Sequence, residues 1–204
     1  MALATSIAAC GSSASSDSNE PAGKYQVRVT KAVFPTEQQL AQTSLLRIGV
    51  RNTGPKTVPA LTVTISIAGK AGQTSALPFG YHDPQAGLAQ PDRPVWVLAE
   101  HFPRLAGSGT RGGATTSSHK TFDFGPLKPG KTSEAIWKVT AVKAGRYTLL
   151  FSVDAGLGGQ VKAETAGGKQ PGGSFATTIS QVPPHVVVTD SGEVVEVKPK
   201  QKGE

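Results

Sequence analysis

Residues 61–67 read LTVTISI, and this short stretch decides the fold class. Apolar side chains at positions 61, 63, 65 and 67 alternate with Thr or Ser at positions 62, 64 and 66. A strict period of two is typical of a β-strand that buries one face and exposes the other. The stretch therefore predicts a strand of a sheet that covers a hydrophobic core on one side.

The same alternation recurs before and after this strand. It occurs in residues 25–30 (YQVRVT), 46–51 (LRIGVR), 135–140 (AIWKVT), 147–153 (YTLLFSV) and 175–179 (FATTI). Trp137 falls on the apolar side of its stretch, and we expect it in the core. We expect residues 46–51 and 61–67 to pair as an antiparallel hairpin around the Asn-Thr-Gly turn at 52–54. No segment has the period of a convincing amphipathic helix.

The composition favours strands joined by turns. Of the 204 residues, 24 are Gly and 15 are Pro, and only 17% are charged. This charged fraction is low for a globular domain, and Gly and Pro are typical turn residues. The single cysteine excludes an internal disulfide, and no apolar run reaches the roughly 18 residues of a membrane-spanning helix. We predict an all-β, immunoglobulin-like antiparallel β-sandwich with a long loop insertion at residues 69–125.

The chain divides into five parts by composition. We interpret residues 1–10 as the remnant of a truncated signal peptide that ends in a lipobox, and residues 11–23 as a flexible, serine-rich tether. The sandwich is expected over residues 24–182. Residues 183–198 hold two Val-rich stretches around an Asp-Ser-Gly turn and predict a C-terminal hairpin. Residues 199–204 predict a disordered tail.

Cys10 is the candidate site of lipidation. It is the only cysteine, and the run IAACG at residues 7–11 resembles a lipobox: an aliphatic residue, two small residues and then Cys. This interpretation places the protein outside the cytoplasm, tied by acyl chains to the outer face of the cell membrane. A signal peptide also needs a basic start and an apolar stretch of about 7–15 residues. Only nine residues precede Cys10 and none is Lys or Arg, so a short disordered N-terminus with an incidental cysteine is the alternative.

Three short motifs resemble those of bacterial adhesion-type and CARDB-like repeats. They are V-x-N-x-G at residues 50–54, L-x-P-G at 127–130 and A-G-x-Y-x-L at 144–149. The Gly145-x-Tyr147 step is similar to the tyrosine corner of immunoglobulin-like sandwiches. The whole chain also resembles uncharacterised lipoproteins of Gram-positive, high-G+C (actinobacterial-type) bacteria. The resemblance implies the sandwich fold and no particular activity, because such sandwiches serve many roles.

A metal site is one possible function of the insertion. It contains His82, His101 and His119, and imidazoles that converge on one point bind copper or zinc. A copper-type metal-binding accessory protein is therefore one alternative function. The spacing does not require such convergence, because no two of these histidines are placed for one face of a helix or strand. Solvent-exposed loop histidines are the plainer interpretation.

Aromatic side chains of the insertion suggest a second alternative. Trp96 and Tyr81 would form a platform that stacks on a sugar, as in a cell-wall or carbohydrate-binding module. In the competing interpretation, the insertion folds over one mouth of the sandwich and Trp96 plugs it.

No pattern points to catalysis. The sequence has no Gly-x-Ser-x-Gly elbow, its 14 acidic residues are dispersed, and its glycine-rich stretches lack the closing Gly-Lys-Ser/Thr of a phosphate loop. We expect no catalytic residue and no cofactor. The leading hypothesis is a non-enzymatic adhesion, scaffolding or binding domain whose binding surface is the loop face at residues 79–120.

The positive net charge of the chain is relevant to which binding partners we expect. The formal net charge is +7, but Lys and Arg are scattered along the sequence without a basic stripe and interleaved aromatics. We therefore expect no nucleic-acid partner. The expected partners are the membrane, through the lipid anchor at Cys10, and a cell-wall polymer or protein. A positive charge on a tethered protein also favours anionic head groups or wall polymers, although a merely solvated surface is the simpler interpretation.

Overall fold

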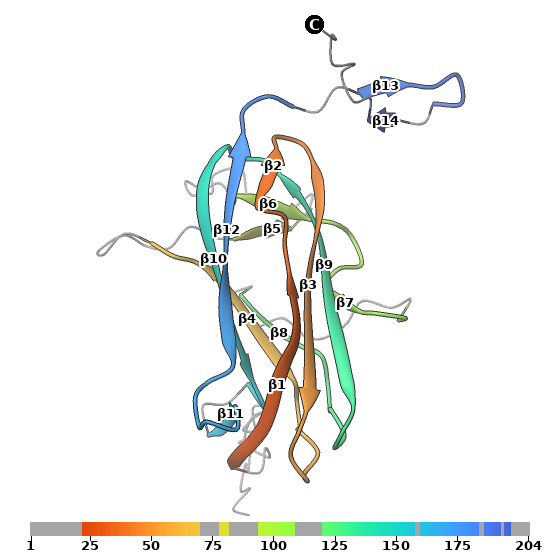
Figure 1. The fold of residues 1–204 in the computed structure, drawn as a ribbon. Coiled ribbons are helices and arrows are strands. Elements are labelled where there is room, and N and C mark those ends of the chain that lie inside the picture. The colour runs from red at the N-terminus through yellow and green to blue at the C-terminus, as the bar shows by residue number, and fades with distance from the viewer. Residues whose placement is uncertain are drawn as a thin grey trace, which may run out of the picture.

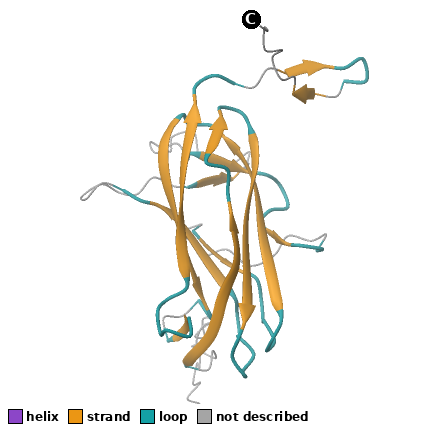
Figure 2. Ribbon diagram, viewed as in Figure 1, coloured by secondary structure: helices purple, strands orange, loops and turns teal. Residues whose placement is uncertain are grey.

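The computed structural model describes residues 22–69, 78–81, 94–108, 120–157, 160–183, 186–192 and 194–196. Two sheets lie face to face along the length of the molecule, and a small hairpin stands at one end (Figures 1 and 2). The described ranges contain no helix, and hence none with the length and apolar character of a membrane span. The fold is the predicted all-β, immunoglobulin-like sandwich.

The first sheet is built around three long strands. Its order is β11 (Val161–Glu164), β1 (Gly23–Val33), β3 (Thr43–Asn52), β9 (Thr132–Ala141), β6 (Trp96–Leu98) and β5 (Phe79–Tyr81), and β7 (Arg104–Leu105) also pairs with β9. The pairs of β3 with β1 and with β9 are antiparallel. The short strands β11 and β5 join in parallel, so the sheet is mixed.

The second sheet closes the sandwich. Its order is β2 (Glu37–Gln39), β12 (Gly172–Ser180), β10 (Gly145–Asp154), β4 (Thr62–Ile67) and β8 (Thr121–Asp123). Only the pairing of β2 with β12 is parallel. Beyond this sheet, β13 (Val186–Val188) and β14 (Val194–Glu196) pair with each other as an antiparallel hairpin.

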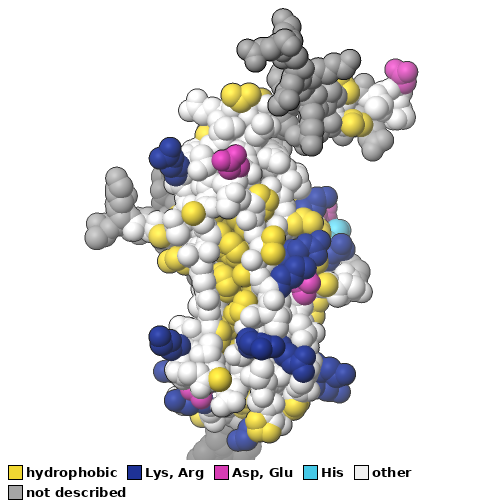
Figure 3. Space-filling view, viewed as in Figure 1, with side chains coloured by type: hydrophobic (Ala, Val, Ile, Leu, Met, Phe, Trp, Pro, Cys, Tyr) yellow, Lys and Arg dark blue, Asp and Glu magenta, His cyan; other side chains and the backbone are white. Residues whose placement is uncertain are grey.

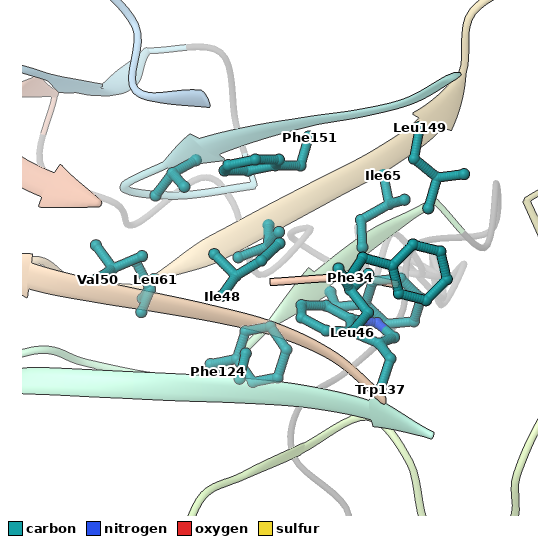
Figure 4. Packing of buried hydrophobic residues seen from close by; sticks show 14 of the residues in the cluster. Phe34, Leu46, Ile48, Val50, Leu61, Ile65, Phe124, Trp137, Leu149 and Phe151 are labelled. Atoms are coloured by element: carbon teal, nitrogen blue, oxygen red, sulfur yellow. The ribbon is translucent and has the colours of Figure 1, made fainter. Parts of the chain in front are cut away.

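The core lies between the sheets and follows the predicted alternation. Leu61, Val63, Ile65 and Ile67 are all buried, and Trp137 is fully buried. Figure 4 shows side chains from the two sheets meeting in one layer of contacts. The expectations that these positions form the core are confirmed.

The tyrosine corner is also present. Tyr147 donates a hydrogen bond from its hydroxyl to the carbonyl oxygen of Ala144, at 3.0 Å. The bond joins the start of β10 to the turn that precedes it.

The predicted hairpin of residues 46–51 and 61–67 is wrong, because β3 and β4 belong to different sheets. Asn52 is the physical reason. Its buried amide donates to the carbonyl oxygens of Lys56 and Leu127, both at 2.8 Å, and its Oδ1 accepts from the N–H of Gly54 at 3.0 Å. These bonds turn the chain across the sandwich. The V-x-N-x-G motif is therefore a corner between sheets.

The predicted insertion at 69–125 contains structural strands. β5, β6 and β7 extend the first sheet, and β8 adds to β4 in the second. These strands have two or three residues each, which is too short for an alternation to stand out in the sequence. Residues 70–77, 82–93 and 109–119 lie outside the described residues.

Candidate functional site

Several predicted site residues lie outside the described residues, namely Cys10, His82 and His119. His101 lies in an exposed turn, where its Nε2 is 3.7 Å from Oε1 of Glu100. Within the ranges that the structure describes, no three His, Cys, Asp or Glu side chains come together as a metal site. The three-histidine metal site stays a prediction.

Trp96 lies in the core, with none of its surface exposed. Its indole N–H donates to Oε1 of Gln38 at 2.9 Å, and the rings of Phe34 and Tyr147 contact it edge-on. Trp96 therefore offers no ring face to a ligand and connects the two sheets instead. For Tyr81, the structure describes only the backbone, which pairs with Leu98.

A different surface brings together charged side chains that are far apart in the sequence. Six cationic side chains lie on the outer face of the first sheet, at outward positions of neighbouring strands. We call this surface the basic face and define it by Arg28 and Lys31 of β1, Arg47 and Arg51 of β3, Lys138 of β9 and Arg104 of β7. Figure 3 shows Lys and Arg side chains clustered over β1, β3 and β9.

The register of the strands explains this clustering. Because residues directly opposite each other in an antiparallel pair share a face, Arg28 lies beside Arg51. Farther along, Val33 is opposite Arg47, and Leu45 is opposite Lys138. Side chains distant in the sequence thereby form one continuous surface.

A β-bulge places Lys31 on this face. The pairing moves from Val29 opposite Val50 directly to Lys31 opposite Gly49, so Thr30 is an extra residue in β1. An extra residue reverses which side of the strand faces outward. Lys31 would otherwise point toward the core, where an unpaired charge is costly.

Gly49 makes room for the bulge. A Cβ atom at this position would lie 3.0 Å from both Lys31 Cβ and Thr30 Oγ1. That separation is shorter than an ordinary van der Waals contact, so a side chain at position 49 would require Lys31 and Thr30 to shift slightly. The glycine avoids this crowding at the bulge.

Glu134 of β9 is the acidic residue in the middle of the face. Its Oε1 accepts hydrogen bonds from Lys31 Nζ and Arg47 Nη1, both at 2.9 Å. The bond from Lys31, followed by that from Arg47, holds the pKa of Glu134 below its ordinary value of 4.5. The carboxylate fixes these two cations in place.

At the other end of the face, the described residues place no carboxylate in an ion pair with the cations. Arg28 and Arg51 are both exposed and directly opposite each other. Among the described residues, neither side chain has an ion-pair or hydrogen-bond partner. Like charges at directly opposite positions destabilise a sheet. An anion between the two guanidinium groups would relieve that repulsion, and each guanidinium can bind a phosphate or carboxylate with two hydrogen bonds.

A polar cavity of about 460 Å³ lies at one end of the sandwich, with Thr62, Thr64 and Asp154 in its wall. The Asp154 carboxylate already accepts hydrogen bonds from the N–H of Ala163, at 3.3 Å, and from Nε2 of Gln170, at 2.7 Å. This carboxylate thus joins the end of β10 to β11 and to the loop that contains Gln170. The basic face, where Arg28 and Arg51 have no ion-pair partner among the described residues, is the stronger candidate for a site.

No protein-family model and no curated protein matches the sequence. Among solved structures, a CARDB domain from Pyrococcus furiosus, in complex with di-metal ions, is similar with a TM-score of 0.44 and 13% identity, over 80% of this chain and 96% of that chain. Native alpha-2-macroglobulin from Escherichia coli, from domain MG7 to its C-terminus, is similar with a TM-score of 0.41 and 14% identity, over 80% of this chain and 18% of that chain. The similarity concerns the fold alone, and no site residue is carried over.

Proposed function

We propose that this chain is a membrane-anchored extracytoplasmic lipoprotein whose β-sandwich is a non-enzymatic binding domain, and that it holds an anionic partner on the basic face. The observation that carries the proposal is the pair of guanidinium groups of Arg28 and Arg51, which lie opposite each other without an ion-pair partner among the residues that the structure describes. The Lys31–Glu134–Arg47 cluster beside them is ordered by its own ion pairs.

The strands prepare this surface for binding. The inward side chains of β1 and β3, including Val27 and Ile48, are packed in the core. The cations on the outer side therefore stand on a backbone that is already ordered, which lowers the entropy lost on binding. Clustered cations also steer an anionic partner toward the face.

A binding role suits the shape of the site. Arg28, Arg51 and Lys138 are exposed side chains on a sheet face, whereas substrate sites of enzymes are concave and enclose most of a small ligand. This surface supports contact with an extended or planar partner, which is the work of a scaffold or adhesion domain.

The anchor part of the proposal rests on Cys10. Residues 11–22 separate it from Gly23, the first residue of β1, and β1 carries part of the basic face. An acylated Cys10 would thus hold this face within reach of the membrane that bears the anchor.

The test uses the full chain and soluble polyphosphate as the probe. We expect Arg28→Glu/Arg51→Glu to reduce affinity by about tenfold or more at low salt, and to make affinity less dependent on salt. The matched control is Lys143→Glu/Lys169→Glu, which changes the net charge equally at exposed positions away from the face. Equal losses in both variants, or no binding by the unmodified chain, would refute the basic face as a specific site.

A further inference from the structure

We infer that the anionic partner of the basic face is the surface of an anionic phospholipid bilayer, on which the outer face of the first sheet lies flat. The inference rests on the proposed function and specifies its partner. It is carried by exposed apolar side chains that share the face with the cations.

Val33 and Leu45 are these apolar side chains. Val33 is 50% exposed and Leu45 is 37% exposed, although both are large and hydrophobic. Val33 lies directly opposite Arg47, and Leu45 directly opposite Lys138. Each apolar group is thus a cross-strand neighbour of a cation.

This pairing matches the chemistry of a bilayer surface. Cations interact with phosphate groups at the head-group level, while neighbouring apolar side chains enter the acyl boundary just below. A soluble polyanion would use the cations but gain nothing from Val33 and Leu45. Exposed apolar side chains inside a cationic surface therefore favour a lipid surface over a polymer.

The arrangement of the cations also favours a lipid surface. Neighbouring strands are about 4.8 Å apart, so cations on β1, β3 and β9 spread across the sheet as well as along it. Head groups form a two-dimensional layer of phosphates, whereas a single polymer chain is a line. The layer can engage the Arg28–Arg51 pair and the more distant Lys138 together.

The test uses the full chain carrying Cys10→Ala, so that acylation cannot contribute. Binding is measured by co-sedimentation with vesicles of phosphatidylglycerol and phosphatidylcholine in equal parts, with vesicles of phosphatidylcholine alone, and with soluble polyphosphate. We expect binding to the mixed vesicles and much weaker binding to phosphatidylcholine.

The deciding variant is Val33→Ser/Leu45→Ser, which keeps every charge. We expect its affinity for the mixed vesicles to fall about fivefold or more, because the variant lacks apolar area that the bilayer would bury. Its affinity for polyphosphate should equal that of the parent. The matched control is Leu150→Ser/Val182→Ser, which removes two other exposed apolar side chains, 40% and 62% exposed, away from the basic face. This control should bind the vesicles as the parent does.

The outcomes separate the two proposals. If Val33→Ser/Leu45→Ser binds the mixed vesicles as well as the parent does, or if phosphatidylcholine is bound equally, the lipid surface is not the partner. A loss of polyphosphate binding in Arg28→Glu/Arg51→Glu would then still support an anionic partner of another kind. If the parent binds neither vesicles nor polyphosphate, the proposed function fails with the inference.

Discussion

The indole N–H of Trp96 donates a hydrogen bond of 2.9 Å to Oε1 of Gln38, and this bond joins the two sheets of the sandwich. Trp96 begins β6 in the first sheet and Gln38 lies in β2 of the second. Both residues are buried. The bond therefore links β2, at the edge of the second sheet, to β6, an inner strand of the first sheet, across the core.

We expect Gln38→Leu to lower the free energy of unfolding by about 1–3 kcal/mol, because the indole N–H would remain buried without an acceptor. Trp96→Phe removes the donor and also leaves a cavity, so the double variant should lose less than the sum of the two single losses. Urea denaturation of both single variants and the double variant gives the coupling energy. Strictly additive effects would show that the bond contributes nothing of its own.

Asn52 provides a second, independent test of the fold. Asn52→Ala removes a buried amide that makes three hydrogen bonds at the corner between β3 and β4. We expect a loss of about 2–4 kcal/mol, because the carbonyls of Lys56 and Leu127 lose their donor. The neighbouring exposed Thr53 is the control, and Thr53→Ala should change unfolding by less than about 0.5 kcal/mol. Similar losses in the two variants would contradict the corner role.

The core strands were predictable from the sequence because their period is local. The alternation at residues 61–67 and around Trp137 records which side chains face inward, and the apolar positions that it marks are buried, although Thr62 and Ile136 are buried as well. The connection from β3 to β4 was not predictable in the same way. Asn52 has the features of a turn residue. Whether the chain after it forms a hairpin or crosses to the other sheet depends on the hydrogen bond to Leu127, a partner distant in the sequence.

The basic face shows the same limit for function. Arg28 and Arg51 occupy outward positions of two predicted strands, so each was identifiable as exposed. Their proximity depends on the register of β1 against β3, and the place of Lys31 depends on the bulge at Thr30. Neither the register nor the bulge can be read from one strand alone. Gly49, a glycine inside an alternating stretch, was the available signal, since such glycines often mark a bulge.

Lipidation of Cys10 is the prediction that tests the compartment. In native membranes, we expect an N-terminal peptide that begins at Cys10 and carries a diacyl- or triacylglyceryl mass. Cys10→Ala should leave near-ultraviolet circular dichroism unchanged, because every described core residue lies beyond position 21, and should weaken retention in the membrane fraction. An unmodified Met1 on the native protein would remove the anchor from the proposal.

Glu134 makes the basic face sensitive to acid. Its pKa is lowered in the folded protein by the hydrogen bond from Lys31 and then by that from Arg47. A carboxyl group with a lowered folded-state pKa stabilises the protein above its unfolded pKa, and this stabilisation is lost as the pH falls through the folded value. The stability of the parent should therefore fall below about pH 4.5 more steeply than that of Glu134→Gln.

Protonation of Glu134, which lowers stability, should strengthen the binding of anions. Neutralising Glu134 releases Lys31 and Arg47 from their ion pairs and raises the positive charge of the face. Glu134→Gln should therefore bind polyphosphate more tightly than the parent at neutral pH, and the difference should shrink as acid protonates Glu134 in the parent. The measurement is the affinity ratio of the two proteins from neutral pH to below pH 4.5. A ratio that stays constant over this range would show that the carboxylate does not control these cations.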